Sequence, residues 1–223
     1  MTNLLIEPEL NQIEEQVQRM GSEVEKAIEL SIGALVTRNV PLAEQVIEND
    51  DRIDALELES DQNGIRVLAL KSPEARDLRF VVAASKIVTI LERIGDHASN
   101  IARAAIDLSG QPTFLFHSDI PQMAQIAREM LHDALEALRA PDAAAAARKI
   151  IERDDEIDLL YDRLFQELLD RVSHDPSNAI QATRLVLVGK NLERIGDCAK
   201  DICEEIVYMK EAQVIKHSRL AKE

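Results

Sequence analysis

The sequence Leu-Glu-Arg-Ile-Gly-Asp occurs twice in this chain, at residues 91–96 and again at residues 192–197. An identity of this length within 223 residues indicates an internal duplication. A duplicated chain folds into an architecture that contains the same unit twice, so the repeat predicts a fold in two similar halves. Each copy also carries a glutamate and an aspartate four residues apart, which a helix would place one turn apart on one face.

Composition and periodicity both favour helices. Glycine and proline are scarce, with 7 of each, and aromatic residues make up only 3% of the chain, which disfavours sheet. Apolar residues recur at every third or fourth position in six segments, as in amphipathic helices. We expect these helices at about residues 9–38, 42–70, 74–107, 119–139, 143–172 and 177–210. The clearest linker, Ser109-Gly110-Gln111-Pro112-Thr113, separates the third segment from the fourth.

The order of these segments predicts the fold class. Three helices, a linker and three more helices favour an all-α protein of two tandem antiparallel three-helix bundles, related by internal duplication. We expect the first repeat at residues 1–110 and the second at residues 111–223. Hydrophobic residues make up 46% of the chain, which is enough for two packed cores and argues against disorder.

The net charge of −15 restricts the classes of partner. A nucleic-acid-binding protein would show a basic stripe, and direct binding to an anionic membrane is also disfavoured. The acidity fits cation binding, or docking on a basic partner surface. The longest apolar stretch, Val81 to Leu91, is broken by Lys86 and is too short to span a bilayer, and we see no basic signal-peptide segment. We therefore expect a soluble cytoplasmic protein.

A second acidic motif is also repeated. Asp50 and Asp54 in the second segment match Asp154 and Asp158 in the fifth segment. With 41 acidic residues in the chain, such pairs arise by chance, and most of them lie on solvated faces. A helical projection nevertheless places these four aspartates within the apolar stripes of their helices, and it does the same for Glu92 and Asp96 of the first sextet.

Inward-facing carboxylates need compensation, because burying an unpaired carboxylate costs several kcal/mol. One explanation is a bound cation, for which oxygen ligands would favour Mg, Mn, Ca, Fe or Zn. The other is a structural ion-pair network. The predicted metal ligands are Asp50, Asp54, Glu92, Asp96 and Asn100 in the first repeat, and Asp154, Asp158, Glu193, Asp197 and Asp201 in the second. Four or more carboxylates in one groove allow a multinuclear site.

The chain shows no arrangement typical of a nucleotide-binding or triad enzyme, because it lacks a P-loop and a Ser-His-Asp order. A carboxylate-bridged di-metal enzyme is the alternative to a binding protein. Di-iron bundles use Glu-x-x-His, whereas His97 lies five residues after Glu92, so this alternative is the weaker one. Gly95 and Gly196 precede the motif aspartates and indicate close approach of a neighbouring helix, for packing or for the site itself.

These residues resemble those of the PhoU family of phosphate-transport regulators. The resemblance is carried by both copies of the sextet, followed by Asn100-Ile101-Ala102 in the first repeat and by Asp201-Ile202 in the second. The two Asp-x-x-x-Asp motifs and the tandem layout support it, and the match covers almost the whole chain. Repeat one has Asn100 where repeat two has Asp201, which implies that the two sites differ in charge.

The resemblance implies a non-enzymatic, dimer-forming accessory of the high-affinity phosphate ABC transporter. It implies two partners, the ATPase subunit of that transporter and a membrane sensor histidine kinase, which would hold a cytoplasmic protein at the inner membrane. In the family's usual role, the protein keeps the phosphate-starvation response off when phosphate is ample. Multinuclear clusters of iron or zinc, or else of magnesium or manganese, on the acidic motifs are a further implication.

Overall fold

The computed structural model describes residues 6–111 and 119–215, and within them all regular secondary structure is helical. The helices are α1 (Glu7–Thr37), α2 (Val40–Lys71), α3 (Ala75–Ser109), α4 (Asp119–Arg139), α5 (Ala143–Ile151), α6 (Asp154–His174) and α7 (Ala179–Glu211), with a short 3₁₀ helix, η1 (Pro176–Asn178), before α7. Pro112 and Thr113 of the expected linker lie outside the described residues. None of the described helices combines the length and apolar character needed to cross a bilayer.

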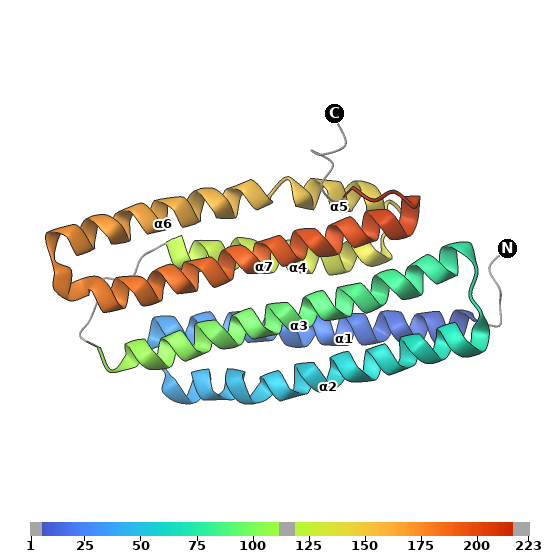
Figure 1. Ribbon diagram of the computed structural model, residues 1–223, viewed down its shortest axis with the longest axis horizontal. Helices are drawn as coiled ribbons and strands as arrows, with labels where there is room; N and C mark the ends of the chain where they lie inside the picture. Colours follow the sequence, from blue (N-terminus) through green and yellow to red (C-terminus); the bar gives the residue numbers. More distant parts are fainter. Residues whose placement is uncertain (1–5, 112–118, 216–223) are drawn as a thin grey trace.

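The helices form two bundles, as the sequence predicted. Helices α1, α2 and α3 pack on one another, and α4, α5, α6 and α7 form the matching second group. Figure 1 shows α3 and α7 side by side in the middle of the molecule, with α2 and α6 on the outer sides. The expected all-α fold of two duplicated bundles is therefore confirmed. The boundary between residues 110 and 111 stays a prediction, since residues 112–118 lie outside the description.

The middle helix of the second repeat differs from the expectation. The sequence predicts one helix over about residues 143–172, but the structure has two, α5 and α6, separated by a turn at Glu152 and Arg153. The Arg153 guanidinium is held against α4, 2.8 Å from Glu129 Oε2 and 3.2 Å from Asp133 Oδ2. The matching residue in the first repeat is Asn49, and α2 continues through it without a break. The break places Asp154 at the first residue of α6.

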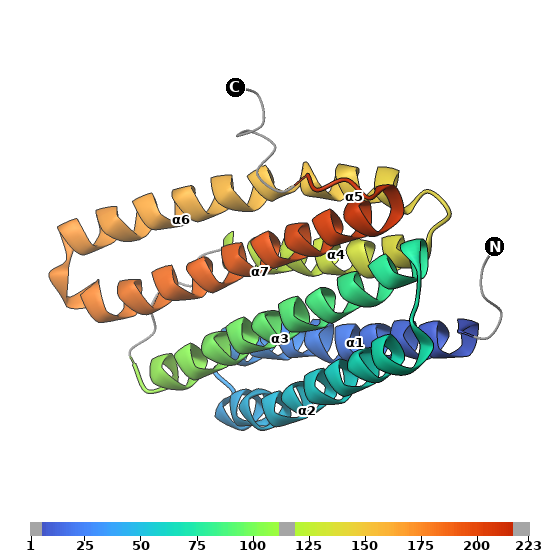
Figure 2. The same ribbon diagram turned by 45° about the vertical axis from the view of Figure 1, so that its right-hand side comes forward.

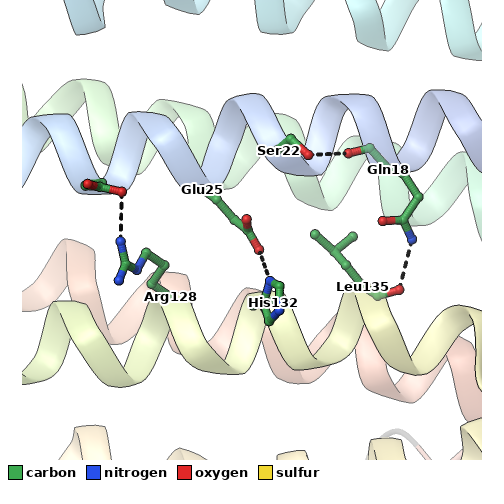
Figure 3. Close-up of polar contacts among 7 residues, drawn as sticks. Gln18, Ser22, Glu25, Arg128, His132 and Leu135 are labelled. Atoms are coloured by element: carbon green, nitrogen blue, oxygen red, sulfur yellow. Dashed lines mark hydrogen bonds and ion pairs between the residues drawn. The ribbon is translucent and has the colours of Figure 1, made fainter.

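One contact between the repeats joins α1 to α4. Figure 3 shows Gln18 Nε2 donating to the Leu135 carbonyl at 2.9 Å, and His132 Nδ1 at 3.1 Å from Glu25 Oε1. Arg128 forms a further ion pair with an acid of α1, Glu29, at 2.8 Å. Polar side chains therefore fix the register of this contact along its solvent-facing edge.

The other contact between the repeats joins α3 to α7, which lie side by side in both views (Figures 1 and 2). Lys86 Nζ on α3 lies 3.0 Å from Glu205 Oε2 on α7 and 5.2 Å from the centre of the Tyr208 ring. Leu91 and Leu192, the first residues of the two sextets, are fully buried in the core. The duplicated sequence thus lies on the two central helices. The acids of the first copy lie near α2, and those of the second copy lie near α6.

Candidate metal centres

The first acidic cluster consists of Asp50 and Asp54 on α2 with Glu92 and Asp96 on α3. Burial, followed by repulsion from these carboxylates and from Glu57, raises the pKa of Glu92 to about 6. Burial and the charges of Asp96 and Asp54 also raise the pKa of Asp50, although the neighbouring Ser99 hydroxyl and Arg103 oppose that shift. These mutual effects show that the fold brings the four predicted acids of the first repeat together.

This cluster has little internal charge compensation. Within residues 6–111 and 119–215, no lysine or arginine forms an ion pair with any of its four acids. Asp50 and Glu92 are half-buried, whereas Asp54 and Asp96 are exposed, so two of the four carboxylates are open to solvent. The helical projection was therefore right about which acids converge and wrong about how far all of them turn inward.

The second acidic cluster consists of Asp154 and Asp158 on α6 with Glu193 and Asp197 on α7. Asp154 is the most buried of them, with 6% of its surface exposed. Burial and the charges of Asp154, Glu193 and Asp197 raise the pKa of Asp158. Burial and the charges of Asp154 and Glu193 likewise raise the pKa of Asp197. The four predicted acids of the second repeat are therefore also close together.

Basic side chains enter the second cluster. Lys200 Nζ forms an ion pair with Asp154 Oδ2, and Lys190 Nζ forms one with Glu193 Oε2. Burial alone would lower the pKa of Lys200, but its hydrogen bond to Asp154 and the charges of Asp154 and Asp197 raise it overall. A third pair joins Arg194 to Asp197 at 3.2 Å. The ion-pair network considered from the sequence is thus present in this repeat.

The two motif glycines allow the close approach of α2 and α6. A Cβ atom at Gly95 would lie 3.1 Å from Ile53 Cδ1 and 3.4 Å from Asp50 Oδ1. At Gly196 it would lie 2.6 Å from Ile157 Cδ1 and 3.8 Å from Asp154 Oδ1. In both repeats the nearest atom belongs to a buried isoleucine, so side-chain packing sets the distance between the two helices. The aspartate three residues before that isoleucine is thereby held close to the glycine.

Comparison with known proteins agrees with this duplicated geometry. A sequence model described as the PhoU domain matches residues 17–105 and again residues 120–206. This chain belongs to the PhoU family. It is 40% identical to the phosphate-specific transport system accessory protein PhoU homolog of Aquifex aeolicus, over 95% of this chain and 96% of that protein. The homolog of the same name from Clostridium acetobutylicum is 38% identical over 94% and 95% of the two chains.

Two solved structures of PhoU proteins share the fold. The crystal structure of PhoU from Pseudomonas aeruginosa superimposes with a TM-score of 0.89 at 32% identity, covering 93% of this chain and 100% of that one. The phosphate transport system regulatory protein PhoU from Streptococcus pneumoniae gives a TM-score of 0.88 at 29% identity, covering 94% and 98%. The family's two-repeat architecture therefore extends over nearly the whole of this chain.

The remaining two predicted ligands of this PhoU-family chain have other contacts. Asn100 is exposed, and its Oδ1 accepts a hydrogen bond from Arg103 Nη1 at 3.0 Å. Asp201 Oδ2 lies 3.9 Å from Arg93 Nη1 on α3, at the contact between the repeats. Either residue would have to exchange an arginine for an ion in order to act as a metal ligand.

The chemistry of the clusters fits a hard or borderline cation, because every donor is a carboxylate and several of them have raised pKa values. In the described parts of the chain, no group of three or more His, Cys, Asp and Glu side chains is already arranged to hold an ion. Ion binding therefore requires rotation of side chains, which the exposed Asp54, Asp96 and Asp158 can make. Among residues 6–111 and 119–215, the first cluster has no ion pair to break.

His97 does not complete a di-iron ligand set in this structure. Its Nδ1 lies 3.0 Å from Asn191 Oδ1 on α7, so the ring is engaged at the contact between the repeats. The corresponding residue in the second repeat, Cys198, is a free thiol whose pKa is raised by burial to about 11. Neither side chain adds a nitrogen or thiolate ligand to the carboxylates.

Proposed function

We propose that this protein is a non-enzymatic regulator of phosphate uptake and of phosphate-starvation signalling. The observation that carries the proposal is the similarity, over nearly the full length of both chains, to proteins named phosphate-specific transport system accessory proteins. The convergence of the acids in both repeats supports a binding role for the same surfaces. In this role the protein represses the starvation response when phosphate is ample.

The proposal includes two protein partners. The protein acts as a cytoplasmic homodimer that contacts the ATPase subunit of the phosphate ABC transporter and a membrane sensor histidine kinase, and these contacts hold it at the inner membrane. The net charge of −15 supports docking on basic surfaces and argues against nucleic acid as a partner. Copurification of each partner with the tagged protein, and the molar mass in solution, test these contacts separately.

We also propose that the acidic clusters bind metal ions, in a multinuclear site of iron or zinc, or else of magnesium or manganese. Asp50, Asp54, Glu92 and Asp96 would hold the ions at the first cluster, and the matching four acids would do so at the second. A bound cation would supply positive charge that joins α2 to α3, or α6 to α7. Elemental analysis of protein purified without chelators identifies the metal.

Deletion of the gene tests the regulatory role. We expect genes of the phosphate-starvation response to be expressed at high phosphate in the deletion strain, and to be repressed again when the wild-type gene is restored. Unchanged expression in the deletion strain would contradict the proposed function. Restoring the gene with Asp50→Asn and Glu92→Gln then asks whether the metal centre contributes to repression.

The di-metal enzyme alternative has its own test. A di-metal enzyme should consume oxygen, or show the visible band of an oxo-bridged iron centre, when ferrous iron is added to the metal-free protein. A spectrum without such a band excludes this alternative and leaves the regulatory proposal unaffected.

A further inference from the structure

A cleft lies beside the first acidic cluster, where the C-terminal part of α3 passes the N-terminal half of α7. Its volume is about 570 Å³, and its polar lining consists of Asn100, Arg103 and Asp107 from α3 with Arg184 and Asn191 from α7. Figures 1 and 2 both show these two helices side by side. The cleft is therefore formed by both repeats, and neither bundle alone contains all of its polar groups.

The charge of this cleft is opposite to that of the whole chain. Its charged residues are two arginines and one aspartate, which leaves one net positive charge in a protein whose total is −15. Arg184 Nη2 pairs with Asp107 Oδ2 at 2.9 Å, and both side chains are about half exposed. Arg103 Nη1 donates to the neutral Asn100 Oδ1 at 3.0 Å, and among the described residues it has no carboxylate as ion-pair partner.

Neutral amides add hydrogen-bond donors next to the two guanidinium groups. Asn191 Nδ2 donates to the Leu187 carbonyl at 2.8 Å, and its Oδ1 faces His97 at 3.0 Å, so the side chain is held in place from both ends. A primary amide has two hydrogens, so one donor of Asn191 is left for a ligand. Ile106 and Leu187 form apolar parts of the wall beside the two guanidinium groups.

We propose that this cleft binds a tetrahedral oxyanion and that its ligand is inorganic phosphate. A guanidinium group matches two oxygens of such an anion with two parallel hydrogen bonds, which makes arginine suited to phosphate recognition. The same arginines repel metal cations, so the cleft and the first acidic cluster suit ligands of opposite charge, although the charge of Arg103 also acts on Asp50 of that cluster. The anion would bridge α3 and α7 and thereby the two repeats.

Asp107 gives the cleft a means of distinguishing phosphate from sulfate. Phosphate carries at least one proton near neutral pH and can donate it in a hydrogen bond to a carboxylate. Sulfate is fully ionised, so it has no hydrogen to donate and meets only repulsion from Asp107. The presence of an acid among the arginines therefore favours phosphate.

Binding is tested with inorganic phosphate and the full-length protein in metal-free buffer, by titration calorimetry at constant ionic strength. We expect saturable binding of phosphate to the wild type, and binding at least about ten-fold weaker in Arg103→Gln and in Arg184→Gln, because each loses a charged bidentate donor. Arg66→Gln is the matched control, since Arg66 is an exposed arginine on α2 away from the cleft. This control should bind like the wild type.

Sulfate provides the second arm of the experiment. Wild-type protein should bind sulfate more weakly than phosphate, and Asp107→Asn should reduce that difference. Equal binding of both anions to the wild type would overturn phosphate as the ligand. Circular dichroism of each variant shows that a loss of binding does not come from unfolding.

Three results would overturn the site itself. They are no saturable phosphate binding, an equal loss in the Arg66→Gln control, and phosphate binding that appears only after a metal ion is added. A role of this site in phosphate signalling rests on the proposed function, whereas phosphate binding by the cleft can be tested without it. A failed titration and an unchanged deletion strain are therefore separate outcomes.

Discussion

The first acidic cluster has Ser99 at the position where the second has Lys200, and Thr89 where the second has Lys190. Both lysines form ion pairs with acids of the second cluster, whereas no such pair occurs in the first within the described residues. The repeated sextet is identical in the two copies, so the difference comes from residues one turn away from it. Identical motifs can therefore provide different charge environments.

The helix ends reinforce this difference. Asp154 is the first residue of α6, where the positive end of the helix dipole stabilises a carboxylate. Asp50 and Asp54 lie in the interior of α2 and have no helix terminus beside them. We therefore expect the first cluster to bind a cation more strongly than the second, whose acids are partly neutralised by lysine side chains of the protein itself.

The largest expected effect comes from adding a metal ion to the metal-free protein. At about 100 times its dissociation constant, the ion should raise the free energy of unfolding by ~2.7 kcal/mol, measured by urea denaturation. Asp50→Asn combined with Glu92→Gln should abolish this increase. Asp154→Asn combined with Glu193→Gln should leave most of it, and the reverse pattern would contradict the comparison.

Lys200→Ser should make the second cluster resemble the first. Loss of the ammonium leaves Asp154 buried without its partner, and we expect the metal-free protein to lose about 2 kcal/mol of stability. A divalent cation should restore that loss in the variant. Lys149→Ser, an exposed lysine on α5, is the control and should change stability little. A variant that stays unresponsive to cations would show that Lys200 does not take the place of an ion.

Gly196→Ala tests whether packing is tighter in the second repeat. Its new methyl would overlap Ile157 Cδ1 at 2.6 Å, whereas Gly95→Ala would meet Ile53 Cδ1 at 3.1 Å. We expect a net loss of about 1 kcal/mol for Gly196→Ala, because overpacking exceeds the gain in helix propensity, and a smaller change for Gly95→Ala. Thermal denaturation of the two metal-free variants measures this difference, and a larger loss in Gly95→Ala would reverse our interpretation.

The smallest expected effect concerns the exposed pair between Arg194 and Asp197. Both side chains are more than one third exposed, so Arg194→Gln should cost less than about 0.5 kcal/mol in denaturation experiments. A loss as large as that in Lys200→Ser would mean that the whole ion-pair network, rather than Lys200, neutralises the second cluster.

Much of this arrangement could be predicted from the sequence, since periodicity and the repeat were sufficient for the two bundles and for the convergence of eight acids. The break between α5 and α6 could not be predicted, because it depends on Arg153 contacting α4. Periodicity also does not reveal that Ile65 and Leu68, near the end of α2, are 67% and 36% exposed. Lys200 could have been found by aligning the two repeats beyond the sextet, where Lys200 aligns with Ser99.

The lysine in the second cluster has a consequence for how the molecule responds to its surroundings. The ammonium of Lys200 is part of the chain, so a chelator cannot remove it, and Asp154 in the second cluster keeps a counter-charge when metal ions are absent. Under the proposed metal binding, the first cluster would instead take its counter-charge from ions in solution. The two repeats thus differ in the source of their counter-charge, which is a side chain of the protein in the second repeat and would be a bound ion in the first.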